Sequence, residues 1–78
     1  MSNMTISYNK LWKLLVDKKM SKADLRRAVR FAGNTLTRLR QEKVVDVKIL
    51  MRICDCLDCN VGDIMDFIKT EKTEDGVE

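Results

Sequence analysis

The 78-residue sequence contains no histidine and no proline, and it has only three glycines and four aromatic residues. Because helix breakers are nearly absent and no segment alternates apolar and polar residues between turn signals, we predict helices and no sheet. The chain also lacks a nucleophile motif and a glycine-rich phosphate loop. We therefore predict an all-α protein that is not an enzyme and that needs no cofactor.

Long hydrophobic runs are missing as well. The apolar stretch at residues 14–16 is far shorter than a secretory signal core or a membrane span, so we expect a cytoplasmic protein. Three cysteines are an odd number, which argues against a disulfide framework and agrees with a reducing compartment. A length of 78 residues predicts a single domain with a small core.

Charge is divided unevenly along the chain. Residues 10–43 hold eleven basic and three acidic residues, a net charge of +8, whereas residues 44–78 hold four basic and nine acidic residues, a net charge of −5. This division fits one face that binds a polyanion and another that is kept away from it. Ordinary solvated helix faces would explain the same counts, and charge alone does not separate the two interpretations.

Apolar spacing predicts five short helices, at about residues 8–18, 22–29, 33–41, 47–57 and 61–68. Ser21 with Asp24 resembles a capping box, and Asp46 and Asn60 are the expected N-caps of the fourth and fifth helices. We expect an N-terminal arm at residues 1–5, a domain at residues 6–68 and a disordered polar tail at residues 69–78.

Residues 21–41 match a helix-turn-helix unit, in which two short helices meet at a tight turn. The inward positions of the unit are Leu25, Val29, Phe31, Leu36 and Leu39. The outward positions of its second helix are Gly33, Asn34, Thr37, Arg38 and Gln41. Asn and Gln can pair with adenine and Arg with guanine through two hydrogen bonds, so this face suits the reading of base edges. Free N–H groups near Ser21 suit a phosphate.

Three segments carry a family resemblance: residues 20–25 (MSKADL), 34–39 (NTLTRL) and 50–64 (LMRICDCLDCNVGDI). On these segments the chain resembles the Cro and lambda-repressor type of helix-turn-helix regulator, in particular the small standalone XRE-like members of bacteria and phages. The resemblance implies a five-helix lambda-repressor-like fold. It also implies a transcriptional repressor that binds double-stranded DNA, with residues 33–41 in the major groove.

The resemblance also distributes roles among the residues. It implies that Asn34, Thr37 and Arg38 read bases, with Gly33 and Gln41 at the edges of the contact. It implies that the DNA backbone is bound by Ser21, Lys22, Thr35, Arg40 and Lys43. For Asn34 the alternative role is that of a helix N-cap. For Thr37, Arg38 and Gln41 the alternative is that they are ordinary solvated surface residues without a role in binding.

Two positions depart from the family pattern. Arg26 stands where the family usually has alanine between the two helices, and Arg30 stands where it usually has a glycine, often with positive φ. Both arginines are candidates for extra phosphate contacts. Surface residues that the fold tolerates, without any role in binding, are an equally good interpretation.

Other interpretations concern the second half of the chain. Cys54, Cys56 and Cys59 form a C-x-C-x-x-C motif, but Cys54 and Cys56 lie about 200° apart on a helix and no histidine completes a site, so we predict packing roles and no metal. Ile64, Phe67 and Ile68 suggest a homodimer surface. The alternative function is a protein-interaction module on the same fold, such as an antirepressor, and RNA binding ranks third because no aromatic platform is evident.

Overall fold

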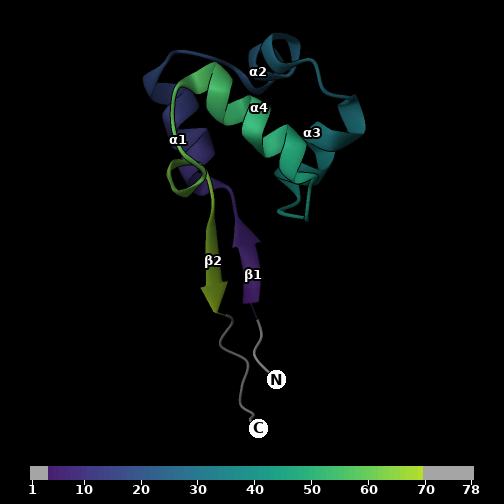
Figure 1. Cartoon of the computed structure of the whole chain (residues 1–78), viewed down its shortest axis with the longest axis vertical. Helices are drawn as coiled ribbons and strands as arrows, with labels where there is room; N and C mark the ends of the chain where they lie inside the picture. The colour runs from purple at the N-terminus through teal and green to yellow at the C-terminus, as the bar shows by residue number, and fades with distance from the viewer. Residues whose placement is uncertain (1–3, 70–78) are drawn as a thin grey trace, which may run out of the picture.

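The computed structural model describes residues 4–69, which form four α-helices, one short 3-10 helix and a two-stranded sheet (Figure 1). The elements in chain order are β1 (Met4–Ser7), α1 (Asn9–Asp17), α2 (Lys22–Val29), α3 (Gly33–Arg40), α4 (Val47–Leu57), η1 (Val61–Asp63) and β2 (Asp66–Lys69). Residues 1–3 of the expected arm and residues 70–78 of the expected tail lie outside the described part. Among residues 4–69, no helix combines the length and apolar character that a membrane crossing requires.

The first four predicted helices are confirmed, and side-chain caps explain where α2 and α4 begin. Ser21 accepts a hydrogen bond from the backbone N–H of Asp24, and the Asp24 carboxylate accepts one from the N–H of Ser21, which completes the predicted capping box of α2. Asp46 caps α4 by accepting a hydrogen bond from the N–H of Lys48. Both helices therefore begin where the sequence indicated.

The predicted fifth helix and the predicted absence of sheet are wrong. Asn60 and Asp63 do form a capping box, but they cap only the 3-10 turn η1, after which the chain becomes strand β2. This strand pairs antiparallel with β1 at the other end of the sequence, and the register places Ile6 opposite Phe67 and Thr5 opposite Ile68. A helix of eight residues that contains Gly62 is marginal, whereas β-branched and aromatic residues suit a paired strand.

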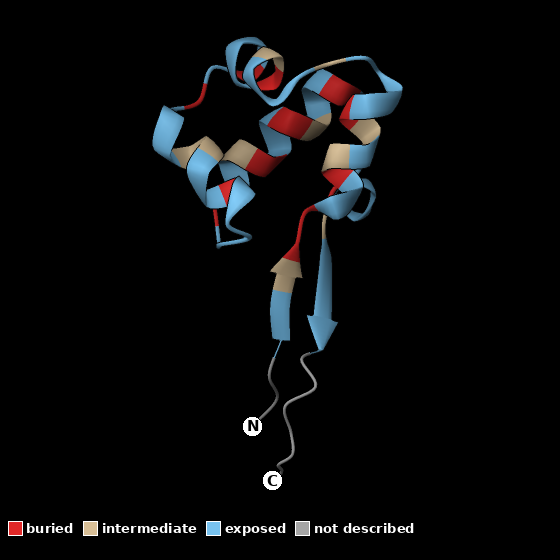
Figure 2. Ribbon diagram, turned by 180° about the vertical axis from the view of Figure 1, so that it is seen from behind, coloured by how far each residue is buried: buried red, intermediate tan, exposed pale blue. Residues whose placement is uncertain are grey.

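The strand pair projects from the helical body, and the two strands lie side by side below it (Figure 1). Residues are buried where the helices face one another and are mostly exposed along the two strands (Figure 2). The buried core consists of Tyr8, Leu11, Leu15, Leu25, Val29, Phe31, Leu39, Val45, Leu50, Ile53, Leu57 and Ile64. Leu36, one of the predicted inward positions, is only half-buried.

Tyr8 connects the core to the loop after α3. Its side chain is fully buried, and its hydroxyl donates a hydrogen bond of 2.9 Å to the backbone carbonyl of Lys43. Burial raises the pKa of the Tyr8 phenol above its ordinary value. A residue beside the first strand thus fixes the loop that follows the helix-turn-helix unit.

Candidate nucleic-acid interface

Helices α2 and α3 form the predicted helix-turn-helix unit and are joined by residues 30–32. Phe31 is buried at the corner, as its position in the sequence indicated. Arg30 has φ 65° and ψ 51°, so the left-handed conformation expected of a glycine at this turn is adopted by an arginine. The turn keeps its geometry without glycine, and the backbone of Arg30 is strained as a result.

The turn is also held from α4. The guanidinium of Arg52 donates hydrogen bonds to the backbone carbonyls of Val29 and Arg30, at 2.6 and 3.4 Å. The last carbonyls of a helix have no partner within the helix, and a cation suits that end of the helix dipole. Arg52 thereby fixes the C-terminus of α2. No local sequence signal points to this contact, because the two partners are 23 positions apart.

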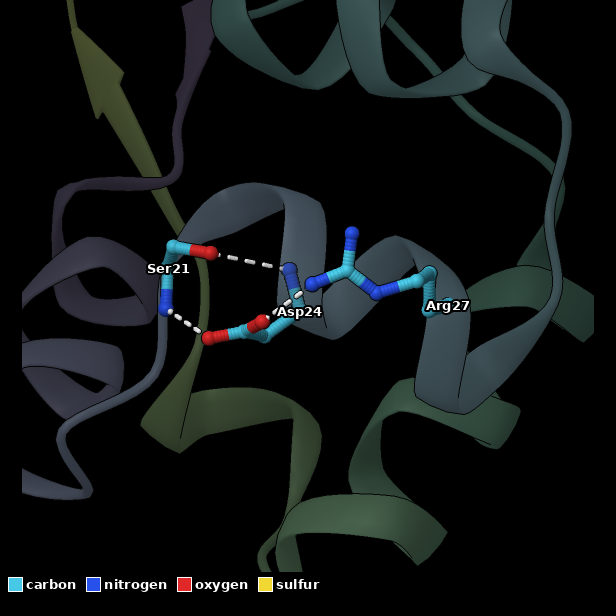
Figure 3. Close-up of polar contacts among 3 residues, drawn as sticks. All are labelled: Ser21, Asp24 and Arg27. Carbon is cyan, nitrogen blue, oxygen red and sulfur yellow. Dashed lines mark hydrogen bonds and ion pairs between the residues drawn. The ribbon is translucent and has the colours of Figure 1, made fainter.

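At the start of α2 the polar groups of Ser21 are already engaged. Figure 3 shows its hydroxyl and its backbone N–H joined to Asp24, whose carboxylate also pairs with Arg27. The hydrogen bonds to Ser21, and then the charge of Arg27, hold the pKa of the Asp24 carboxyl below its ordinary value. An ionised carboxylate therefore stands beside the predicted phosphate contact at Ser21, where it would repel phosphate.

Lys22 is the first residue of α2, and its ammonium group lies 4.3 Å from the centre of the Trp12 ring in α1. A cation over the face of an indole is attracted by the ring's π electrons. Lys22 is exposed and Trp12 half-buried, so this contact lies at the surface between the two helices. This contact could not be predicted from the sequence, because the partners are ten positions apart on separate helices.

The outward face of α3 is open. Gly33, Asn34, Thr37, Arg38 and Gln41 are all exposed, and Gln41 stands just past the end of the helix. Ala32 occupies the cap position, so Asn34 is not the helix N-cap and its side-chain amide is not used in capping. The Thr37 hydroxyl donates a hydrogen bond to the backbone carbonyl of Gly33. Four of the five predicted base readers therefore lie along one short helix.

Arg38 and the predicted contacts to the DNA backbone lie in α3, in the loop that follows it and at the start of α2. The Arg38 guanidinium donates a hydrogen bond of 3.4 Å to the carbonyl of Val44, which turns it toward the loop after α3. Arg40 and Lys43 are exposed, whereas Thr35 is half-buried. The structure thus brings the basic residues of α3 and the following loop to the same end of the unit. Ser21 and Lys22 lie at the start of α2.

Two of the three cysteines in the motif, Cys54 and Cys59, lie close together at the end of α4. The backbone N–H of Cys59 donates to the carbonyl of Cys54 at 3.0 Å, in the manner of a Schellman helix end, and both side chains are half-buried while Cys56 is exposed. Burial, followed by the nearness of Cys54, raises the pKa of Cys59 to about 11. Within residues 4–69, no three His, Cys, Asp or Glu side chains are grouped closely enough to hold a metal ion.

The predicted homodimer residues are divided between core and surface. Ile64 is fully buried and is unavailable to a partner, whereas Phe67 is 64% exposed and Ile68 45% exposed. Phe67 also borders a groove of about 690 Å³ between α4, η1 and β2, whose lining includes Met51, Val61 and Met65. The sequence did not predict this groove because residues 61–68 were expected to form a helix, whereas they form η1 and strand β2.

Comparison with known proteins agrees with this geometry. The sequence model of the Cro/C1-type helix-turn-helix DNA-binding domain matches residues 10–70. Among solved structures, the chain is similar to the transcriptional regulator VanUg in its crystal form II, with 40% identity, a TM-score of 0.86, and coverage of 90% of this chain and 93% of VanUg. No curated protein sequence matches the chain significantly.

Proposed function

The chain belongs to the family of Cro/C1-type helix-turn-helix DNA-binding domains, and from that premise we propose that it is a transcriptional repressor that recognises specific DNA sequences with α3 in the major groove. The observation that carries the proposal is the open outward face of α3, where small polar side chains and one arginine are exposed together. Such a face enters the groove without steric or acidic obstruction. Repression would follow because the bound protein occupies its DNA site and so covers the promoter.

The roles of the base readers follow from their chemistry. The side chain of Asn34 does not cap the helix, so its amide is suited to adenine. Arg38 is suited to guanine through two parallel hydrogen bonds. Arg38 donates to the Val44 carbonyl in the free protein, so binding requires it to exchange that weak contact for a base edge. Thr37 lies at the centre of the contact surface, and Gly33 and Gln41 lie at its edges, where Gly33 presents only its backbone.

Contacts to the DNA backbone are assigned to Lys22 at the start of α2, to Thr35 and Arg40 within α3, and to Lys43 in the loop that follows α3. Lysine and arginine neutralise phosphates and thereby release counterions, so these contacts make binding sensitive to salt. The predicted phosphate contact at Ser21 is left out of the proposed set, because its hydroxyl and its backbone N–H are both hydrogen-bonded to Asp24, whose carboxylate would repel phosphate.

A homodimer is the proposed assembly on DNA, with Phe67 and Ile68 at the interface. Exposed apolar side chains grouped on a small domain often mark an interaction surface, and dimers of helix-turn-helix proteins read two half-sites about one helical turn apart.

Two matched variants test the proposal. Arg38→Ala should lose about 1–3 kcal/mol of binding free energy on the preferred duplex and relax one base position. Lys43→Ala should weaken binding to all duplexes about equally and flatten the dependence on salt. If Arg38→Ala binds every duplex as tightly as the parent protein does, the assignment of α3 as the reading helix is refuted.

A second candidate function is a protein-interaction module, which the apolar groove along α4, η1 and β2 favours. Its exposed apolar side chains include Val47, Met51 and Phe67, and Asp55 and Asp58 border it. If Met51→Ser abolishes regulation in the cell while DNA binding is intact, the protein-interaction function is supported. If only the α3 variants abolish regulation, the DNA-binding proposal stands.

A further inference from the structure

The glycine at the start of α3 leaves a vacant place on the proposed reading face. Gly33 is the first residue of α3, is exposed, and has no side chain with which to contact a base. A Cβ atom built on Gly33 would lie 3.8 Å from both Nε and Nη2 of Arg26. The guanidinium of Arg26, which comes from α2, therefore lies beside the place where a side chain of residue 33 would begin.

We infer that Arg26 is a specificity-determining residue, which supplies from α2 the base contact that Gly33 cannot make from α3. The inference rests on the proposed function, because it concerns the same DNA-reading surface. A guanidinium presents two parallel N–H donors, which match O6 and N7 of guanine in the major groove. Guanine is therefore the base that we assign to this position.

The state of Arg26 in the free protein supports the assignment. Its side chain is exposed, and among residues 4–69 no carboxylate lies within ion-pair distance of it. The next residue, Arg27, is by contrast engaged with Asp24 at the helix start (Figure 3). Arg26 is thus a charged group held at the α2–α3 corner without an anionic partner in the described part of the chain.

The space beside the guanidinium is open because residue 33 is a glycine. A Cβ atom at residue 33 would meet the Arg26 guanidinium only at 3.8 Å, an ordinary van der Waals distance, so the two positions border the same place on the surface. A long side chain at residue 33 would compete for the same space. Arg26 therefore lies at the edge of the place that a longer side chain at residue 33 would fill, and Gly33 leaves that place open.

Selection of bound duplexes from a randomised pool tests the inference, with the parent protein, Arg26→Ala, Arg26→Lys and Arg27→Ala compared side by side. We expect Arg26→Ala to lower discrimination at one guanine position about 5- to 100-fold while the other positions keep their preferences. Arg26→Lys should keep the affinity for non-specific DNA but lose the same discrimination, since lysine lacks the planar fork. Arg27→Ala should leave the base preferences unchanged.

A double variant makes the test specific to the place of residue 33. Arg26→Ala combined with Gly33→Gln returns a reading side chain from α3, and we expect the preference at that one position to change from guanine to adenine. Circular dichroism should confirm that each variant is folded. A parent protein with no sequence preference would refute the proposed function itself. If the parent protein shows a sequence preference, two results would refute this inference alone. One is that Arg26→Ala keeps the preference at every position, and the other is that Arg26→Ala loses affinity equally on all duplexes.

Discussion

The guanidinium of Arg52 in α4 donates a hydrogen bond of 2.6 Å to the backbone carbonyl of Val29, the last residue of α2. The contact joins the helix-turn-helix unit to the helix that packs behind it, at a carbonyl that the helix itself leaves unpaired. The angle at which α2 meets α3 therefore depends on a residue outside the unit.

Arg52→Met should destabilise the protein by about 1–2 kcal/mol, because the Val29 carbonyl loses a charged donor while the apolar stem of the side chain is kept. Urea denaturation followed by circular dichroism measures the loss. Lys48→Met is the matched control on the same helix, since only the backbone N–H of Lys48 is engaged. Equal stability of the Arg52 variant and the parent would show that the contact contributes nothing.

Arg30→Gly should stabilise the protein by about 1 kcal/mol, because a non-glycine residue at φ 65° is strained and glycine is not. Thermal denaturation measures the change. Ala28→Gly, at an exposed position inside α2, should do the opposite and cost about 1 kcal/mol. A loss of stability in Arg30→Gly would mean that the arginine side chain contributes more than the strain costs.

The capping box of α2 should make the protein sensitive to acid. The pKa of Asp24 is lowered in the folded protein, so its carboxylate contributes stability above its unfolded pKa, and this stability is lost as pH falls below about 4. Asp24→Asn, which has no charge to lose, should show a smaller drop in melting temperature between pH 6 and pH 3. Parallel curves for variant and parent would contradict this account.

The three thiols should react at different rates with iodoacetamide. At pH 8, on the order of one Cys59 in a thousand is a thiolate if its pKa is about 11, whereas Cys56 is exposed. Mass spectrometry of peptides should find Cys56 alkylated first and Cys59 last. Alkylation of Cys59 as fast as Cys56 would show that Cys59 is not shielded from solvent.

The four α-helices could be predicted from the sequence because their signals are local. The box of Ser21 with Asp24 and the cap at Asp46 mark helix starts within three residues, and apolar spacing marks the inward faces. The position of the outward face of α3 followed from the same spacing, since α3 buries Leu39 and exposes Asn34.

The strand pair and several site contacts could not be predicted because their partners are distant in the sequence. Residues 61–68 carry apolar positions that fit a helix as well as a strand, and only pairing with β1 decides between them. Neither Arg52 on Val29 nor Arg26 beside Gly33 has a local pattern. The dimer prediction included Ile64 because residues 61–68 were expected to form a helix with surplus apolar surface. In the structure Ile64 directly follows η1 and is buried in the core.

The measurement that tests the central claim most directly is fluorescence anisotropy of labelled duplexes with the purified protein. A duplex selected from a random pool would be compared with a scrambled one over a range of salt concentrations. Sequence-specific recognition predicts that the selected duplex binds about 10³-fold or more tightly than the scrambled one and that both complexes weaken as salt increases. Equal affinity for the two duplexes, or no binding at low salt, would contradict it.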